Sequence, residues 1–439
     1  MTSLNETHNP SLCSWVPRSA PGQSDFPIQN LPFGRFTTES DPSRRVGVAI
    51  GNHVLDLRQM TNIGLLKDLD ASLIKACASD SLNTLMDLTP AQLSTLRLLL
   101  SRLLRHGGPD RSEVVSCLVD ATNALMRMPA DVRNFSDFFT SIHHASNTGR
   151  MLRPHAPLQP NFHHLPVGYH ARSSTLRVSG TPLCRPCGQQ IPKDMTEPVY
   201  EPSRRLDFEC EVAIHIGRGN ELGKPIRVDQ ADESIFGVSL LNDWSSRDLQ
   251  TWESAPLGPF LAKSSLTTLS PWIVTTEALA PFRVAAVRRA SNVPSPLPYL
   301  LDTKDQVNGG IDIQMEIYLQ TEQGRERGLP ATLISSPNFR DQYWTPAQML
   351  AHQTSNGCVV EPGDIIGSGT VSGPVRDQLG CLLELTQGGT LPLELPTGEL
   401  RAFLEDGDEV EIRGRCVANG AVPIGFGVCA GRIHPCQAG

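Results

Sequence analysis

Short apolar runs, each closed by a turn-forming residue, recur along the last two thirds of this 439-residue chain. The runs alternate or stay apolar over the length of a strand, and Gly, Pro, Asn or Asp bounds them, at residues 211–216, 235–241, 312–319 and 409–413. The chain also holds 36 Gly and 35 Pro, a share that favours turn-rich β structure and excludes a coiled coil. We therefore predict a mainly β protein with some α structure.

The first third of the chain has a different pattern. Two β-rich runs within residues 45–57 flank Gly51-Asn52, which predicts a hairpin in a small β domain. Residues 65–128 then show apolar spacings of three and four, typical of several amphipathic helices. We predict a domain boundary near residue 130, with domains at 1–130 and 131–439. Further helices are expected at 135–150 and at 345–354, where Thr345-Pro346 forms an N-cap and first-turn proline.

Charge and hydropathy exclude several classes of partner. The formal net charge is −8 and no Lys/Arg run reaches five residues, so we expect no nucleic-acid partner. No stretch approaches 18 uncharged apolar residues and no apolar leader begins the chain, so we expect a soluble protein with no membrane partner. Eleven scattered cysteines, an odd number, indicate free thiols in a reducing cytoplasm.

Two local motifs give little information about function. Cys184 and Cys187 form a CxxC, but no second pair stands at zinc-site spacing, so we interpret them as ordinary loop thiols. Residues 217–223 resemble a dinucleotide-binding glycine motif, but Leu222 stands where its third glycine should be, and Pro225 follows where a helix should begin. A turn between strands is the better interpretation.

Acidic residues at strand positions are more informative. Residues 207–211 lead directly into an apolar run, and the strand period of two places Glu209 and Glu211 on one face. Like charges on one face are costly unless water or a cation separates them. Asp243 follows another apolar run within the polar cluster 242–248, and Asp137 begins segment 137–145. Four carboxylates without paired Cys or His would suit Mg²⁺ or Ca²⁺ rather than zinc; a solvated strand face is the alternative.

Candidate proton-transfer and donor groups stand near these acids. His143 and His144 are adjacent, so they point in different directions from a helix and at most one serves a given site. Arg247, Gln250 and Lys263 are donors around a turn at 256–260. They could stabilise a developing oxyanion, or they could be surface groups.

At these residues the chain closely resembles the fumarylacetoacetate hydrolase family, and the resemblance covers most of its length. The matching segments are long and keep their order: 24–34, 137–153, 165–172, 178–182, 206–211, 242–250, 256–264, 362–364 and 368–373. The resemblance implies a small N-terminal SH3-like barrel, a large mixed β-roll domain and a homodimer. It also implies a metal-dependent hydrolase that splits a carbon-carbon bond of a small diketo acid, 4-fumarylacetoacetate, into fumarate and acetoacetate in tyrosine and phenylalanine breakdown.

The resemblance also implies roles for individual residues. The positions that match metal ligands of the family are Asp137, Glu209, Glu211 and Asp243. His144 matches the general base and Glu384 the carboxylate that orients it. The positions that match oxyanion donors are Arg247, Gln250 and Lys263. The positions that match substrate-holding groups are Arg153, Tyr169 and Thr370. Lys263 and Thr267 match residues that flank a second cation position.

Three matched positions depart from the family. Phe139 and Ser254 stand where the family has tyrosines that line the substrate pocket, and Leu266 stands where it has a glycine beside the second cation. Two hydroxyls are lost while the reacting groups are kept. The alternatives are therefore a divergent paralogue acting on a related acyl diketone, or an inactive dimeric homologue, against which the retained metal and proton-transfer positions argue.

Overall fold

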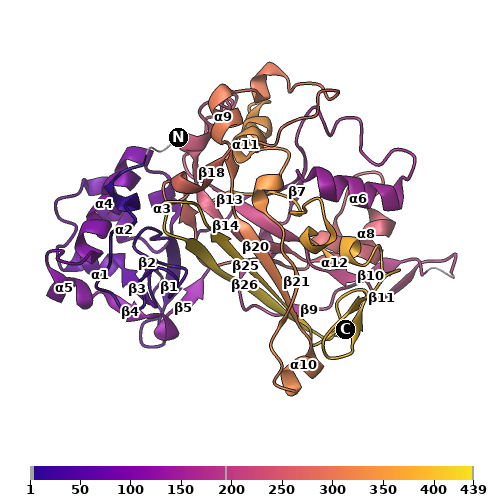
Figure 1. Ribbon diagram of the computed structural model, residues 1–439, viewed down its shortest axis with the longest axis horizontal. Helices are drawn as coiled ribbons and strands as arrows, with labels where there is room; N and C mark the ends of the chain where they lie inside the picture. Colours follow the sequence, from indigo (N-terminus) through magenta and orange to yellow (C-terminus); the bar gives the residue numbers. More distant parts are fainter. Residues whose placement is uncertain (1–3, 193–194, 438–439) are drawn as a thin grey trace.

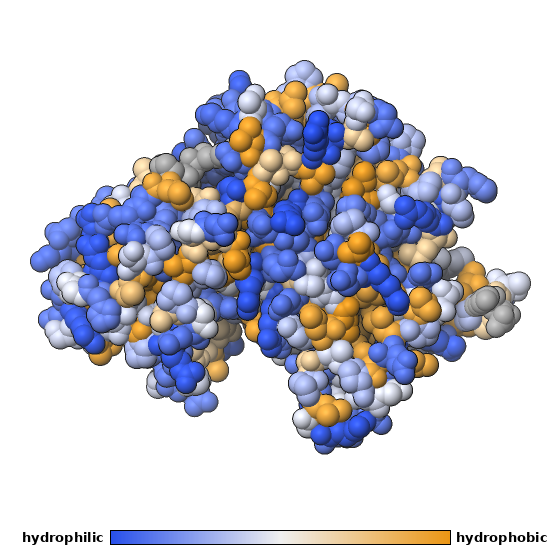
Figure 2. Space-filling model, in the orientation of Figure 1, coloured by the Kyte–Doolittle hydropathy of each residue, from blue (hydrophilic) through white to orange (hydrophobic). Residues whose placement is uncertain are grey.

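The computed structural model describes residues 4–192 and 195–437. In Figure 1 the N-terminal helices and their sheet lie at the left, and two larger sheets occupy the centre. On the face drawn in Figure 2, hydrophilic side chains predominate, and hydrophobic ones lie in groups between them. Among the described residues, no helix combines the length and the hydropathy that crossing a membrane requires.

The N-terminal part contains a five-stranded antiparallel sheet in the order β4-β3-β2-β1-β5. Its strands are β1 Phe33–Thr37, β2 Arg45–Ile50, β3 His53–Asp56, β4 Leu118–Asp120 and β5 Leu125–Arg127. The predicted hairpin is confirmed, because β2 pairs with β3 around Gly51. Gly51 has a φ of +57°, and a Cβ there would lie 2.3 Å from the carbonyl oxygen of Pro17, so glycine suits both the turn and the contact.

Helices cover this first sheet, as the spacing of residues 65–128 predicts. They are α1 Leu57–Asn62, α2 Ala71–Cys77, α3 Asn83–Met86, α4 Pro90–Leu104 and α5 Arg111–Val115. The longest, α4, begins with a capping box in which the Thr89 hydroxyl accepts from the Gln92 amide. Its apolar face, including Leu96 and Leu100, packs into a core with strand residues such as Val46. The pattern missed β4 and β5, which close the same stretch.

A larger sheet runs in the order β7-β6-β22-β13-β14-β16-β8, with β17 paired to β14. Its strands are β6 Phe135–Phe139, β7 Val167–Ala171, β8 Leu176–Val178, β13 Cys210–Ile216, β14 Ile235–Asp243, β16 Thr267–Leu269, β17 Val274–Thr275 and β22 Ile365–Gly367. The pairs β22·β6 and β16·β8 are parallel. Every residue of β13 and β14 is buried, which explains their continuous apolar runs.

A second large sheet, in the order β21-β20-β25-β26-β9, packs against β14. Its strands are β9 Leu183–Cys184, β20 Gln314–Gln320, β21 Thr332–Ser335, β25 Glu409–Cys416 and β26 Ile424–His434. Burial alternates along β20, which confirms the period-two pattern of its sequence. The two sheets approach so closely that a Cβ on Gly431 would lie 2.6 Å from the Trp244 ring. The fold is therefore mainly β with some helix.

Shorter elements complete the described chain. The remaining helices are α6 Ile142–Leu152, α7 Ala231–Ser234, α8 Arg247–Glu253, α9 Thr303–Asn308, α10 Glu322–Glu326, α11 Pro346–Thr354 and α12 Leu382–Leu385. The remaining strands are β10 Cys187–Gln190, β11 Val199–Pro202, β12 Leu206–Asp207, β15 Ser245–Ser246, β18 Arg283–Val284, β19 Gly310–Ile311, β23 Leu393–Glu394 and β24 Leu400–Arg401. Short 3₁₀ helices include η1 Glu6–His8 and η4 Leu261–Lys263.

The structure corrects one predicted helix and confirms another. Over residues 135–150 the first part is wrong: Phe135–Phe139 forms β6, paired with β7 and β22, and α6 begins only at Ile142. The buried pairing on both sides outweighs local helical spacing. Helix α11 is confirmed, and the Thr345 hydroxyl accepts from the Gln348 amide. The glycine motif at 217–223 lies between antiparallel strands β13 and β14, and the one described helix between the motif and β14 is the four-residue α7.

We expect Arg97→Met to destabilise the protein by about 2–5 kcal/mol, because two buried carbonyls would lose their donors. Arg97 lies in α4, is 4% exposed, and donates to the carbonyls of Gln29 and Asn30 and to the Thr7 hydroxyl. Chemical denaturation measures the change. Arg102→Met is the control on the same helix, since Arg102 is half exposed and pairs with Glu6 at the surface. Equal losses in the two variants would contradict the prediction.

Candidate active site

Three of the predicted acidic residues converge in the larger sheet. Asp137 lies in β6, Glu211 in β13 and Asp243 at the end of β14, and one carboxylate oxygen from each lies within 4.8 Å of the others. Gly367 in β22 pairs with Asp137 and lies between these strands. A Cβ on Gly367 would stand 2.5 Å from Asp137 Oδ1 and 3.2 Å from Glu211 Oε2. The missing side chain therefore leaves the space in which two carboxylates meet.

The electrostatics of this cluster favour a bound cation. Asp137, Glu211 and Asp243 are at most 3% exposed, and Asp137 Oδ1 and Glu211 Oε1 have no hydrogen-bond partner. Burial, followed by the charge of Asp243, raises the pKa of Asp137 to about 7. Burial and the neighbouring carboxylates raise the pKa of Glu211 well above its usual value. Unpartnered carboxylate oxygens in one buried cluster are the donors that a hard divalent cation takes.

Glu209, the fourth predicted ligand, lies beside this cluster and is paired with cationic side chains. Its Oε1 lies 2.5 Å from Lys263 Nζ and 2.6 Å from Arg247 Nη1. Burial alone would raise the pKa of Glu209, but Arg247 and Lys263 hold it below its usual value. Lys263 Nζ also lies 2.7 Å from Asp243 Oδ2, and the Thr267 hydroxyl donates to Asp243 Oδ1 at 2.9 Å. Lys263 therefore bridges Glu209 to the cluster.

His144 is joined to Glu384, the partner that the resemblance implies. His144 Nδ1 lies 2.6 Å from Glu384 Oε2, and both side chains are buried. Ser141 caps α6 by accepting from the His144 amide. Burial would raise the pKa of Glu384, but His144 and three hydrogen bonds lower it below its usual value. No described contact joins the ring of His143 to Glu384, so the two adjacent histidines differ in their contacts with this carboxylate.

The predicted oxyanion donors surround Glu209. Arg247 and Gln250 lie in α8, and Lys263 ends η4. Arg247 Nη1 donates to Gln250 Oε1 at 3.2 Å as well as to Glu209. Arg247 Nη2 is buried and has no protein partner. One guanidinium nitrogen is thus left available for an oxygen of a bound molecule.

The predicted substrate-binding residues divide into two groups. Tyr169 in β7 donates to Asp243 Oδ2 at 3.4 Å, and the Thr370 hydroxyl donates to Glu209 Oε2. The ring of Phe139 meets the His144 ring edge-on, 5.1 Å between centroids. Arg153 is exposed and bonds the Pro157 carbonyl, so the structure does not bring it to the cluster. Ser254 is half-buried and donates to the Gln250 carbonyl. Leu266 is buried in the main core beside Thr267.

Some residues of this site carried no predicted role. Asn147 Nδ2 and Ser372 Oγ donate to Glu384 at 2.8 and 2.7 Å. Asp207 accepts from Arg247 Nε at 2.9 Å. Asn147 stands one helical turn after His144, and Asp207 stands two residues before Glu209, so spacing offered a signal for both. Ser372 offered none.

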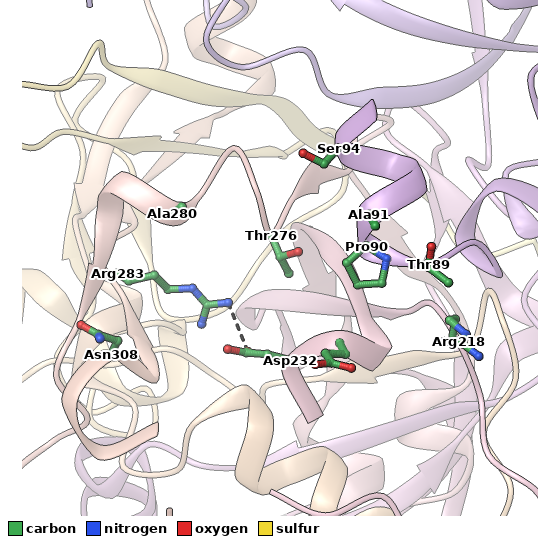
Figure 3. Close-up of a pocket in the computed structure, with 11 residues that line it drawn as sticks. Thr89, Pro90, Ala91, Ser94, Arg218, Asp232, Thr276, Ala280, Arg283 and Asn308 are labelled. Carbon is green, nitrogen blue, oxygen red and sulfur yellow. Dashed lines mark hydrogen bonds and ion pairs between the residues drawn. The ribbon is translucent and has the colours of Figure 1, made fainter. Parts of the chain in front are cut away.

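A large cavity lies away from these residues. Its volume is about 800 Å³, and none of the residues that line it is a predicted site residue. Figure 3 shows it between the start of α4, with Thr89 and Pro90, and the Arg283–Asp232 ion pair. The presence of a large cavity therefore does not by itself identify the predicted site.

Together, these features define a mixed-β protein with a buried acidic cluster and an adjacent His–Glu pair. Two family models match the sequence, "Fumarylacetoacetase N-terminal" over residues 29–129 and "Fumarylacetoacetate (FAA) hydrolase C-terminal" over 133–434. The chain belongs to the fumarylacetoacetate hydrolase family.

Named relatives agree with this assignment. The chain is 45% identical to the fumarylacetoacetase of Arabidopsis thaliana over 94% of this chain and 96% of that protein. It is 44% identical to that of Homo sapiens, over 94% and 97%. The fumarylacetoacetate hydrolase of Exiguobacterium antarcticum has a similar fold, with a TM-score of 0.50 and 17% identity over 92% of this chain and 99% of that one.

We expect a divalent cation to stabilise the EDTA-treated protein, by about 2.7 kcal/mol at a hundredfold excess over the dissociation constant. Thermal melts with Mg²⁺ or Ca²⁺, together with calorimetric titration, measure this. Glu211→Gln should abolish both the shift and the binding, because it removes one charge from the cluster. Glu221→Gln, at an exposed residue paired with Lys224, should keep them. Absence of binding to the unmodified protein would contradict the prediction.

Proposed function

We propose that this chain is a metal-dependent hydrolase that cleaves 4-fumarylacetoacetate with water to give fumarate and acetoacetate. Relatives named fumarylacetoacetase, matched over nearly the whole chain, support this substrate. The observation that carries the proposal is the 2.6 Å contact between His144 and Glu384 in a site that also holds the acidic cluster.

The proposed metal centre uses Asp137, Glu211 and Asp243, with Glu209 as a fourth ligand. Mg²⁺ or Ca²⁺ suits these oxygen donors, and Thr267 with Lys263 would flank a second cation. When bound, the ion would act as a Lewis acid toward the diketone oxygens and the leaving enolate.

His144 supplies the base in this proposal. Because Nδ1 is held by Glu384, Nε2 is the nitrogen that accepts a proton from water. Glu384 then stabilises the imidazolium, and Asn147 and Ser372 hold Glu384 in place. The hydroxide oxygen bonds to the ketone carbon of the fumaryl group, which makes that carbonyl oxygen an alkoxide.

The donors around Glu209 act on this alkoxide. Arg247 Nη2, which has no protein partner, donates to it, and Gln250 and Lys263 add to the positive potential. The carbonyl then re-forms as a carboxyl group while the carbon-carbon bond breaks, and the electron pair leaves on the methylene carbon between the two ketones, which becomes the methyl carbon of acetoacetate. Protonation of that carbon, by a proton returned from His144, completes the two products.

Substrate recognition in the proposal involves Tyr169, Thr370 and Arg153, together with the departures Phe139 and Ser254. Phe139 touches the proposed base, so a hydroxyl missing there is missing beside the substrate. This contact keeps a second candidate open, a paralogue that accepts a related acyl diketone.

We also propose a cytoplasmic homodimer with domains at 1–130 and 131–439. The two family matches, which meet between residues 129 and 133, support the boundary. Exposed apolar side chains on the stretch from α8 to η4, including Trp252, Leu257 and Phe260, support a partner surface beside the site. Eleven free thiols fit a reducing compartment.

The protein is expected to turn over fumarylacetoacetate in the presence of Mg²⁺, measured as loss of diketone absorbance. His144→Ala should lower the rate by ~10² to 10⁴, the usual effect of losing a general base. His143→Ala is the matched control and should keep most of the rate, since its ring has no described contact with Glu384. Comparable losses in the two variants would remove the assignment, and an inactive unmodified protein would overturn the proposed function.

Restoring the two family hydroxyls should tighten binding of fumarylacetoacetate. Each regained neutral hydrogen bond is worth about 0.5–1.5 kcal/mol, so Phe139→Tyr with Ser254→Tyr should lower KM by roughly fivefold or more. An unchanged kcat would show that these contacts stabilise the bound substrate and the transition state equally. A KM that stays the same or rises would show that the two positions do not face this substrate.

A further inference from the structure

Asp207 joins two parts of the site that are far apart in sequence. It ends β12, its side chain is fully buried, and its carboxylate accepts from three donors. One is Arg247 Nε at 2.9 Å, and the others are the backbone amides of Leu382 and Leu383 at 2.8 and 3.0 Å. The first donor belongs to α8 and the other two begin α12.

On the α8 side, Asp207 determines which nitrogen Arg247 presents. A guanidinium is planar, so holding two of its nitrogens places the third. Asp207 holds Nε, Glu209 and Gln250 hold Nη1, and Nη2 remains buried and unpartnered. Strand β12 pairs with β15, and α8 follows β15 directly, so the backbone fixes the separation of Asp207 from Arg247.

On the α12 side, Asp207 replaces a missing cap. Helix α12 has four residues, and its own N-cap, Cys381, makes no side-chain cap hydrogen bond. So short a helix is not stable by itself and depends on outside contacts. Asp207 accepts from the first two amides of α12, and Glu384 is the next residue after Leu383. Asp207 therefore holds the backbone of the helical turn that carries Glu384.

We propose that Asp207 is a positioning residue that sets the direction of Arg247 Nη2 and the place of Glu384 with one carboxylate. This inference rests on the proposed function for its catalytic consequence. Asp207 does not reach the substrate; it acts through the two groups it holds. One buried side chain thus links the donor that meets the alkoxide to the carboxylate that orients the base.

The test compares Asp207→Asn with Asp248→Asn. Asparagine keeps the shape but offers one acceptor oxygen. Its amide nitrogen replaces either Oδ2, which accepts from both Arg247 Nε and the Leu383 amide, or Oδ1, which accepts from the Leu382 amide. Asp248 is the matched control: it follows Arg247 in α8, and it accepts from the amides of Arg204 and Arg205 without touching Arg247 or α12. We expect Asp207→Asn to lower kcat roughly tenfold to hundredfold with KM little changed, below the ~10² to 10³ for complete loss of a donor. Asp248→Asn should match the unmodified enzyme.

A double substitution separates positioning from general loss of structure. In an Arg247→Ala background, Asp207→Asn should cost a smaller factor than in the unmodified enzyme, because residues that act through one another are not additive. The inference would be overturned if the losses of kcat in the two single variants multiply in full in the double variant. A rise in KM without loss of kcat, or an equal effect of Asp248→Asn, would also overturn it. Asp207→Ser, smaller and uncharged, serves as the second variant if Asp207→Asn does not fold.

Hydrogen exchange tests the α12 contact without substrate. Protection of the Leu382 and Leu383 amides should fall in Asp207→Asn and persist in Asp248→Asn. Unchanged protection would overturn the inference even in an active enzyme. An unmodified protein that does not turn over fumarylacetoacetate would instead overturn the proposed function, while the exchange result would still decide the contact.

Discussion

Concentrating like charges inside a sheet is the constraint on which the rest of this structure depends. Asp137, Glu211 and Asp243 bring three carboxylates into one buried space, where burial disfavours every ionised form. Neighbouring strands hold them there, because β6, β22, β13 and β14 are joined by backbone hydrogen bonds and Gly367 leaves room between. Burying three carboxylates together costs free energy, and their unpartnered oxygens are candidate ligands for a metal ion.

The protein also brings its own cations to the edge of this cluster. Lys263 lies between Glu209 and Asp243, and Arg247 lies between Glu209 and Asp207. Acidic and cationic side chains thus alternate from the acidic cluster to the start of α12. Truncating one member would leave a buried charge without its partner, so these residues depend on one another more than their separate contacts suggest. The same order explains why Arg247 and Lys263 can remain charged at full burial: the carboxylates beside them raise the pKa of each above its usual value.

The sequence pattern predicted those elements whose structure depends on residues close together in the chain. The β2–β3 hairpin, the cap of α11 and the alternation in β20 follow from turn residues, a Thr-Pro start and a period of two. The pattern failed at β6, whose partners β7 and β22 come from later in the chain. The contact of His144 with Glu384 spans 240 positions, so no spacing rule reaches it. Resemblance to a family supplied that pair, but it gave no role to Asp207 or Asn147, which touch the side chains at the site rather than a substrate.

Phe139 and Ser254 lie beside groups of the proposed site without taking part in its ion pairs. Phe139 presents a ring edge to His144 but carries no group that could accept or donate the proton of the reaction. Ser254 donates its hydroxyl hydrogen to the carbonyl of Gln250 at the end of the preceding helix. The groups that would move protons or stabilise charge contact one another directly, His144 with Glu384 and Glu209 with Arg247 and Lys263. Differences in substrate among chains with this site can therefore arise around the reacting groups without disturbing the buried charges that hold them.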